Sequence, residues 1–184
     1  MTDEELIKGC VRENKDSQYA LYQKYAGKMM GICLRYASNR MEAEDILQES
    51  FMKIFDNISK FRSEGSFEGW MKRVVVNVAL RFYQKRTQNR IEFQEDLHEN
   101  ETAVFLPRAI DKINEKDLLN LINTLPQGYR LVFNLFAIEG YSHVEIGEML
   151  QIGESTSRSQ LNKARKWLQS KLKESDKEVY EKQG

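Results

Sequence analysis

The chain has 184 residues, of which 41% are hydrophobic and 30% charged, and its 28 basic and 28 acidic side chains cancel. This length allows one domain or two small ones, and such a composition is ordinary for small helical units with much surface. With only two cysteines, Cys10 and Cys33, we expect no disulfide framework, no cysteine-based zinc site and a reduced compartment. No apolar run approaches membrane-spanning length and the acidic start MTDEELIKGC is unlike a signal peptide, so we expect a cytoplasmic protein without membrane insertion.

The first half of the chain has the pattern of long helices, because its first 106 residues contain no proline. We expect helices over residues 16–36, 41–58 and 68–86, with the polar loop SKFRSEGSF before the third. The second helix carries an apolar stripe at intervals of three and four residues, formed by Leu47, Phe51, Ile54 and Ile58.

A change of composition separates the two halves. Residues 92–101 hold five acids and no Lys or Arg, and the helical pattern is lost over 87–112. We therefore expect a flexible acidic linker over residues 89–112. It is either a soluble tether or a mimic of DNA that discourages binding by the free protein.

The second half predicts a further set of helices. One runs from about residue 113 and stops at Pro126, and the next, GYRLVFNLFAIEG, ends at Gly140. Ser142, with Glu145 three residues later, forms a capping-box pattern for HVEIGEML. The predicted fold is all-α, with two small helical domains over 1–88 and 113–175 and a polar tail over 176–184.

Charge is segregated along the chain although its total is zero. Residues 70–90 and 158–173 each hold six basic side chains and no acid. The alternative for any one such run is a solvated helix face. Two runs, one in each domain, favour nucleic acid, because clustered Lys and Arg neutralise phosphates and release counterions.

The segment YSHVEIGEMLQIGESTSRSQLNKARKWL has the plan of a helix-turn-helix, although an ordinary helical hairpin is the alternative. Its second helix has a predicted inward face at Ser157, Leu161, Ala164, Leu168 and Leu172. Small hydroxyls outside allow close approach to DNA, Arg and Asn can pair with base edges, and Lys reaches phosphate. The expected DNA contacts are Ser155, Thr156, Arg158, Ser159, Asn162, Lys163 and Lys166.

Three segments, in this order and separation, resemble bacterial RNA polymerase sigma factors of the extracytoplasmic-function (ECF) group. They are EAEDILQESFMKIF, FRSEGSFEGWMKRVVVNVA and LPQGYRLVFNLFAIEGYSHVEIGEML with ESTSRSQLNKAR. The resemblance covers about residues 15–173. It implies a transcription initiation factor, not an enzyme, that uses no cofactor or metal. Such a factor binds core RNA polymerase at the β′ clamp helices and β flap, directs it to certain promoters and helps melt them. An anti-sigma factor is a further partner that the family allows.

The resemblance also assigns residues. Polymerase would contact Asp45, Gln48 and Glu49, and the helix-turn-helix would read the promoter −35 element. The −10 element would be captured by the loop and melted by the basic helix after it, through Arg62, Ser63, Glu64, Gly65, Ser66, Lys72, Arg73, Asn77 and Arg81. Four positions depart from the family pattern, namely Arg81, Gln151, Gly153 and Ser155.

Physical reasoning supports a site for unstacked bases, which needs aromatics in a basic groove. Phe61, Phe67 and Trp70 are candidates, although we expect Trp70 itself to pack in the core. Asn77 would need a partner, which is either a local hydrogen bond or DNA. Three alternatives remain. They are a free-standing helix-turn-helix regulator, a helical adaptor that binds only protein, and a metal or acid–base site in the acidic segment 42–49.

Overall fold

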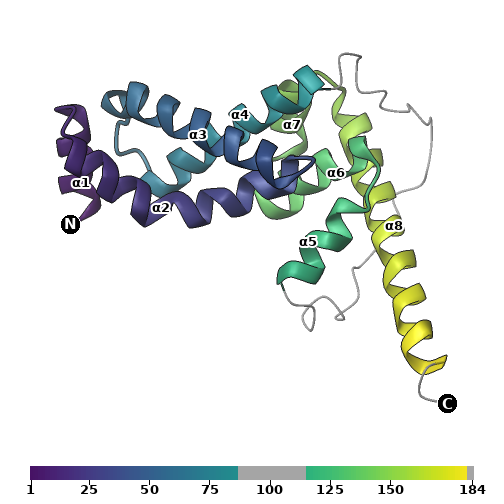
Figure 1. Cartoon of the computed structure of the whole chain (residues 1–184). Coiled ribbons are helices and arrows are strands. Elements are labelled where there is room, and N and C mark those ends of the chain that lie inside the picture. The colour runs from purple at the N-terminus through teal and green to yellow at the C-terminus, as the bar shows by residue number, and fades with distance from the viewer. Residues whose placement is uncertain (87–114, 182–184) are drawn as a thin grey trace. The chain divides into compact units, whose positions relative to one another are not determined.

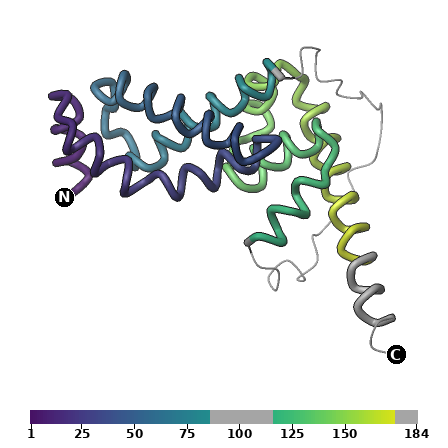
Figure 2. Tube along the Cα trace, viewed as in Figure 1, coloured from purple at the N-terminus to yellow at the C-terminus, as the bar shows by residue number. Residues whose placement is uncertain are grey.

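The computed structural model describes the backbone of residues 1–86 and 115–181, and these residues form helices and turns only, which confirms the all-α prediction. The chain divides into two compact units, Met1–Arg90 and Ile91–Gly184. Figures 1 and 2 trace the helices, coloured along the chain from the N-terminus to the C-terminus. The expected linker, with its tether and DNA-mimic interpretations, lies outside the described residues. None of the described helices is long and apolar enough to cross a membrane.

The first unit is a bundle in which α2 packs against both α3 and α4, and α1 packs on α2. Its elements are α1 (Asp3–Val11), α2 (Lys15–Tyr36), α3 (Arg40–Asn57), the 3-10 turn η1 (Ile58–Lys60) and α4 (Phe67–Arg86). The predicted stripe of α3 is buried along its length. Asn14 and Asn39 cap α2 and α3, because each side chain accepts a hydrogen bond from a backbone N–H of the first turn.

Helix α1 was not predicted. Thr2 and Glu5 form a capping box, and Leu6 and Cys10, four residues apart, bury one side of the helix. Asp3 accepts hydrogen bonds from Lys24 (Nζ–Oδ1 2.8 Å) and from Tyr25 (Oη–Oδ1 2.7 Å). These donors hold the pKa of Asp3 below its usual value, so the carboxylate that docks α1 on α2 is charged at neutral pH.

The second unit is built around its last helix, which contacts the three other helices of the unit. Its elements are α5 (Glu115–Asn123), α6 (Gln127–Phe133), the π-helical η3 (Asn134–Ile138), α7 (His143–Leu150) and α8 (Glu154–Glu181). Ser142 and Glu145 form the predicted capping box of α7. The inward face predicted for α8 is confirmed, since all five residues are buried.

One helix in this unit differs from the sequence-based expectation. The single helix expected over 128–140 is α6 followed by a π-helical turn, and Gly140, with a φ of 81°, ends it. The tail expected from residue 176 continues as helix to Glu181.

In the first unit, both cysteines are free and buried, and burial raises the pKa of Cys33 to about 12.

Candidate nucleic-acid and polymerase interfaces

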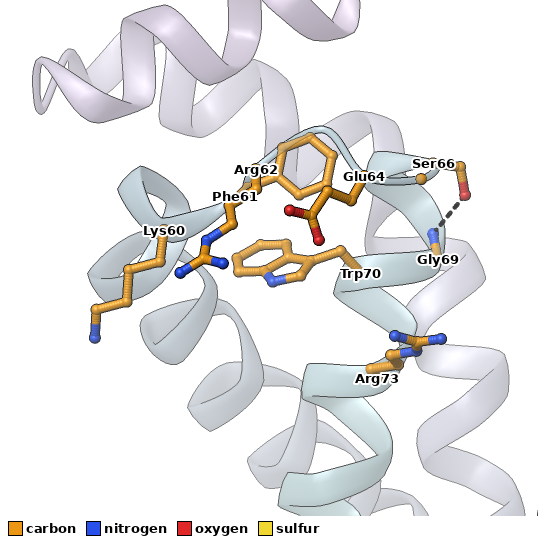
Figure 3. Close-up of a pocket in the computed structure, with 9 residues that line it drawn as sticks. Lys60, Phe61, Arg62, Glu64, Ser66, Gly69, Trp70 and Arg73 are labelled. Carbon is orange, nitrogen blue, oxygen red and sulfur yellow. Dashed lines mark hydrogen bonds between the residues drawn. The ribbon is translucent and has the colours of Figure 1, made fainter.

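A pocket of about 360 Å³ lies between the loop after η1 and the first turns of α4 (Figure 3). It is lined by Lys60, Phe61, Arg62, Glu64, Gly65, Ser66, Gly69, Trp70 and Arg73. Trp70 stacks on Phe67 with ring centroids 5.7 Å apart and an interplanar angle of 18°, and it also contacts Phe61 at 5.7 Å. Phe67 is buried, whereas Trp70 is half-buried and forms a wall of the pocket, so the expected core position of Trp70 needs correction.

Local hydrogen bonds and one strained residue shape this loop. Ser63 has a φ of 58°, a left-handed conformation that is unfavourable for a residue with a side chain. The Ser66 hydroxyl accepts a hydrogen bond from the N–H of Gly69 at 3.0 Å, and the Ser66 carbonyl accepts one from the N–H of Trp70 at 3.1 Å. A Cβ at Gly69 would lie 2.8 Å from the hydroxyl oxygen of Ser66, so glycine permits this close turn.

Helix α4 presents a basic stripe beyond the pocket. Arg73, Asn77, Arg81 and Lys85 are exposed and follow one another at intervals of four residues, which places them on one face. Asn77 is exposed and needs no internal partner. Lys72 lies off this stripe, where its Nζ is 3.1 Å from Glu68 Oε1. Lys28 of α2 binds the other oxygen of Glu68 at 2.7 Å, and both bonds hold the pKa of Glu68 below its usual value.

The outer face of α8 holds most of the residues expected to contact −35 DNA. Ser155, Arg158 and Lys166 are exposed, while Ser159, Asn162 and Lys163 are half-exposed. Thr156 is only 8% exposed and packs inward, so the structure does not place it on this face. Arg158 pairs with Glu154 at 2.6 Å, and the Ser159 hydroxyl donates to the Thr156 carbonyl at 3.1 Å.

Two polar side chains for which the sequence predicted no role, Gln160 and His143, are buried in the second unit. Gln160 is almost fully buried, although its side chain is polar. His143 is buried too, with its Nδ1 2.9 Å from the Ser157 hydroxyl and its ring stacked on Phe136 at a centroid distance of 4.4 Å. The histidine–serine contact joins α7 to α8. His143 directly follows the capping residue Ser142 and lies 14 residues before Ser157, so no local sequence pattern predicts this contact.

The turn between α7 and α8 accommodates the two unusual residues of the sequence. Gln151 adopts the left-handed conformation (φ 56°, ψ 44°) that glycine usually occupies, and its N–H and that of Ile152 both donate to the Gly147 carbonyl. A Cβ at Gly147 would lie 2.8 Å from the Ile152 carbonyl oxygen, so a side chain at this position would clash with the backbone of the turn. Gly153 precedes α8 and its carbonyl accepts from the N–H of Ser157 at 3.0 Å, so the helix begins without a capping side chain there.

Helix α3 carries the residues expected to contact polymerase. Asp45 and Gln48 are exposed and Glu49 is half-buried. A groove of about 530 Å³ lies beside them, lined by Tyr22, Met30, Glu44, Leu47, Gln48, Phe51, Met52 and Phe55. Met52 is 60% exposed, which is unusual for a large apolar side chain. No group of three or more His, Cys, Asp or Glu side chains in the described part of the chain could hold a metal ion.

Two helical units, the second containing a helix-turn-helix with a basic outer face, define a DNA-binding protein of the all-α class. The family profile described as Sigma-70 region 2 matches residues 21–89, and the one described as Sigma-70, region 4 matches residues 115–168. The ECF RNA polymerase sigma-E factor of Haemophilus influenzae is 28% identical over 183 residues, covering 94% of this chain and 96% of that protein. The ECF sigma factor SigW of Bacillus subtilis is 28% identical over 178 residues, covering 91% of this chain and 95% of that protein.

Solved structures show the same fold. The sigma factor RpoE of Bartonella quintana, in complex with the anti-sigma factor NepR, matches with a TM-score of 0.53 and 19% identity over 84% of this chain and 97% of that one. The chain therefore belongs to the ECF group of the sigma-70 family. It is accordingly a promoter-specific transcription initiation factor for RNA polymerase, and sigma factors of this kind are regulatory proteins.

Proposed function

We propose that the chain reads a promoter at two points while it is bound to core RNA polymerase. The loop pocket and α4 bind the −10 element and help melt it, and the outer face of α8 reads the −35 element. The pocket beside the basic stripe of α4 is the observation that carries this proposal. A free-standing helix-turn-helix regulator needs only the second unit and leaves both features of the first unit unexplained.

At the −10 element, an unstacked base enters the pocket and lies against the indole of Trp70. Stacking on an aromatic side chain is worth about 1–3 kcal/mol per base, which offsets the cost of taking the base out of the duplex. The guanidinium groups of Arg73 and Arg81 bind phosphates along the melted strand. Lys72 pairs with Glu68 of the same helix, and Glu68 in turn joins α4 to α2 through Lys28, so the charge of Lys72 is already partly neutralised when DNA arrives.

At the −35 element, the first turns of α8 enter the major groove. An α-helix with its side chains is about 10–12 Å across, which fits a groove about 12 Å wide. Arg158 and Asn162 have the geometry to pair with base edges, while Lys163 and Lys166 reach phosphates. The buried contact between His143 and Ser157 joins α8 to α7 and leaves the reading face free.

Core polymerase binds through α3 and the second unit. Asp45, Gln48 and Glu49 contact the β′ clamp helices, and the second unit contacts the β flap. We assign residues 1–88 to polymerase binding and the −10 element, 89–112 to the linker and 113–175 to the −35 element, with 176–184 as a polar C-terminal segment. The chain acts in the cytoplasm. An anti-sigma factor is a further proposed partner, supported by the complexes in which its structural relatives were solved.

Transcription in vitro with core polymerase on a library of randomised promoters tests this function. The full chain is expected to co-purify with core polymerase and to enrich one pair of elements among the transcribed promoters. Replacing both Arg158 and Lys163 by Ala should weaken use of the −35 element, because Arg158 loses a base-reading contact worth about 1–3 kcal/mol and Lys163 loses a phosphate contact. Lys116→Ala, an exposed change elsewhere in the second unit, is the control. Absence of polymerase binding would rule out the proposal, and full activity of the double variant would favour an adaptor that binds only protein.

A further inference from the structure

The polar side chains around the loop pocket differ in what they can offer a base. Four side chains of the pocket can donate hydrogen bonds but cannot accept them. They are Lys60, Arg62, Arg73 and, through its indole N–H, Trp70. Ser66 already accepts a hydrogen bond from the N–H of Gly69. Glu64 is the only carboxylate among the residues that line the pocket, so it is the one side chain there that acts purely as an acceptor.

The carboxylate of Glu64 is available for a ligand. It is exposed and makes no hydrogen bond or ion pair with any residue of the described chain, and the same holds for the guanidinium of Arg62 two residues before it. Figure 3 shows both groups beside the indole of Trp70, on which a base would stack. The pocket therefore presents a free acceptor and a free donor to the edge of one stacked base.

From this arrangement we infer that Glu64 selects a base with an exocyclic amino group and rejects thymine. An amino group donates to the carboxylate, as the N4 amino group of cytosine does to acidic side chains in direct base readout. The neighbouring ring nitrogen or carbonyl of such a base can accept from Arg62. Thymine has no amino group, and its single ring N–H lies between two carbonyl oxygens, so a carboxylate that approaches this edge meets an acceptor on either side. This inference rests on the proposed capture of a −10 base.

The test compares the full-length wild type with Glu64→Gln, each bound to core polymerase, on promoters with a randomised −10 element. Gln has the same shape, but its amide can donate to a thymine carbonyl. Sequencing of the open complexes should show, at one position, thymine depleted about 5- to 100-fold in the wild type. In the Glu64→Gln variant, the depletion of thymine at that position should fall to within about twofold, and the base preferences at the other positions should stay unchanged. Glu4→Gln removes the same charge from exposed α1 and should keep the wild-type preferences.

Defined templates then isolate the amino group. If cytosine is selected, 5-methylcytosine and thymine at that position have the same outline and differ in the amino group and ring proton. If adenine is selected, the matched base without the amino group is purine. If guanine is selected, the matched base is hypoxanthine. Loss of the amino group should weaken wild-type open complexes and not those of Glu64→Gln.

Two results would overturn the inference while leaving the proposed function standing. One is a Glu64→Gln holoenzyme that keeps the wild-type preference at every position. The other is a uniform gain in affinity for all sequences, which would mean that Glu64 only repels phosphate. If the wild-type holoenzyme enriches no sequence at all, the proposed function itself fails.

Discussion

Replacing Leu168 by Ala should destabilise the second unit and leave the first unit unchanged. Leu168 is 1% exposed on the inward face of α8, between Ala164 and Leu172. Truncating a buried leucine costs about 2–5 kcal/mol, because apolar contacts are lost and the cavity closes only partly. A unit of roughly 65 residues has a free energy of unfolding of about 3–10 kcal/mol. The variant thus removes a large share of the stability of the second unit.

The two tryptophans of the chain provide the assay, since Trp70 lies in the first unit and Trp167 in the second. In full-length chains that carry either Trp70→Phe or Trp167→Phe, fluorescence follows the urea unfolding of one unit at a time. With Trp167 as the reporter, Leu168→Ala should lower the urea midpoint by about 1–3 M. With Trp70 as the reporter, the midpoint should stay within experimental error.

Ile138→Ala is the matched control, because it removes an apolar side chain that is 39% exposed in the same unit. It should change the free energy of unfolding by less than about 0.5 kcal/mol. Equal shifts at both reporters would show that the chain unfolds as one cooperative body and would refute the reasoning. An unshifted Trp167 transition would show that Leu168 is not part of a packed core.

Three further predictions concern single side chains. Gln151→Gly should stabilise the second unit by about 0.5–1 kcal/mol in the same urea assay, because relief of the left-handed strain exceeds the added entropy of the unfolded chain. Glu154→Gln should strengthen promoter binding by about 0.2–1 kcal/mol at low salt, since it frees Arg158 and removes an acid near phosphates, and filter binding should show the gain vanish at high salt. Cys33 and Cys10 should resist alkylation in the native chain at pH 8 and react after denaturation, as followed by mass spectrometry, because burial raises the pKa of both thiols.

Periodic burial explains why most of the helices could be predicted from the sequence. The stripe of α3 and the inward face of α8 recur at intervals of three and four residues, and every member is buried. The Ser142–Glu145 capping box is also local, because its two hydrogen bonds join residues three apart. In both cases the signal lies within a single helix and does not depend on its neighbours.

Features that depend on contacts between helices were missed. Helix α1 buries only Leu6 and Cys10, and its docking relies on the hydrogen bonds of Asp3 to α2. The π-helical turn after α6 breaks the regular period without a proline or an internal glycine to announce it. Thr156 is polar and was expected outside, yet packing at the start of α8 places it inside.

The candidate −10 site illustrates the same division. The sequence, through its family resemblance, predicts the loop residues and the basic residues of α4 as contacts of the −10 element. It did not indicate that Trp70 would form a pocket wall stacked on a buried Phe67, because that depends on how the loop folds back on α4. Glu64 and Arg62 have no hydrogen-bond or ion-pair partner among the residues that the structure describes, and their place beside one pocket became visible only once its lining was known.

If the loop pocket captures a −10 base as proposed, the left-handed Ser63 has a consequence for the kinetics of promoter opening. Its backbone costs about 1 kcal/mol relative to glycine, and that cost is met when the protein folds. The loop is then already in shape when DNA arrives, so the entropy of ordering it, about 1–2 kcal/mol for each backbone residue, does not oppose capture. The barrier to capture consequently lies in the unstacking of the base, and promoters whose duplex opens more readily at that step should be isomerised faster by the same holoenzyme.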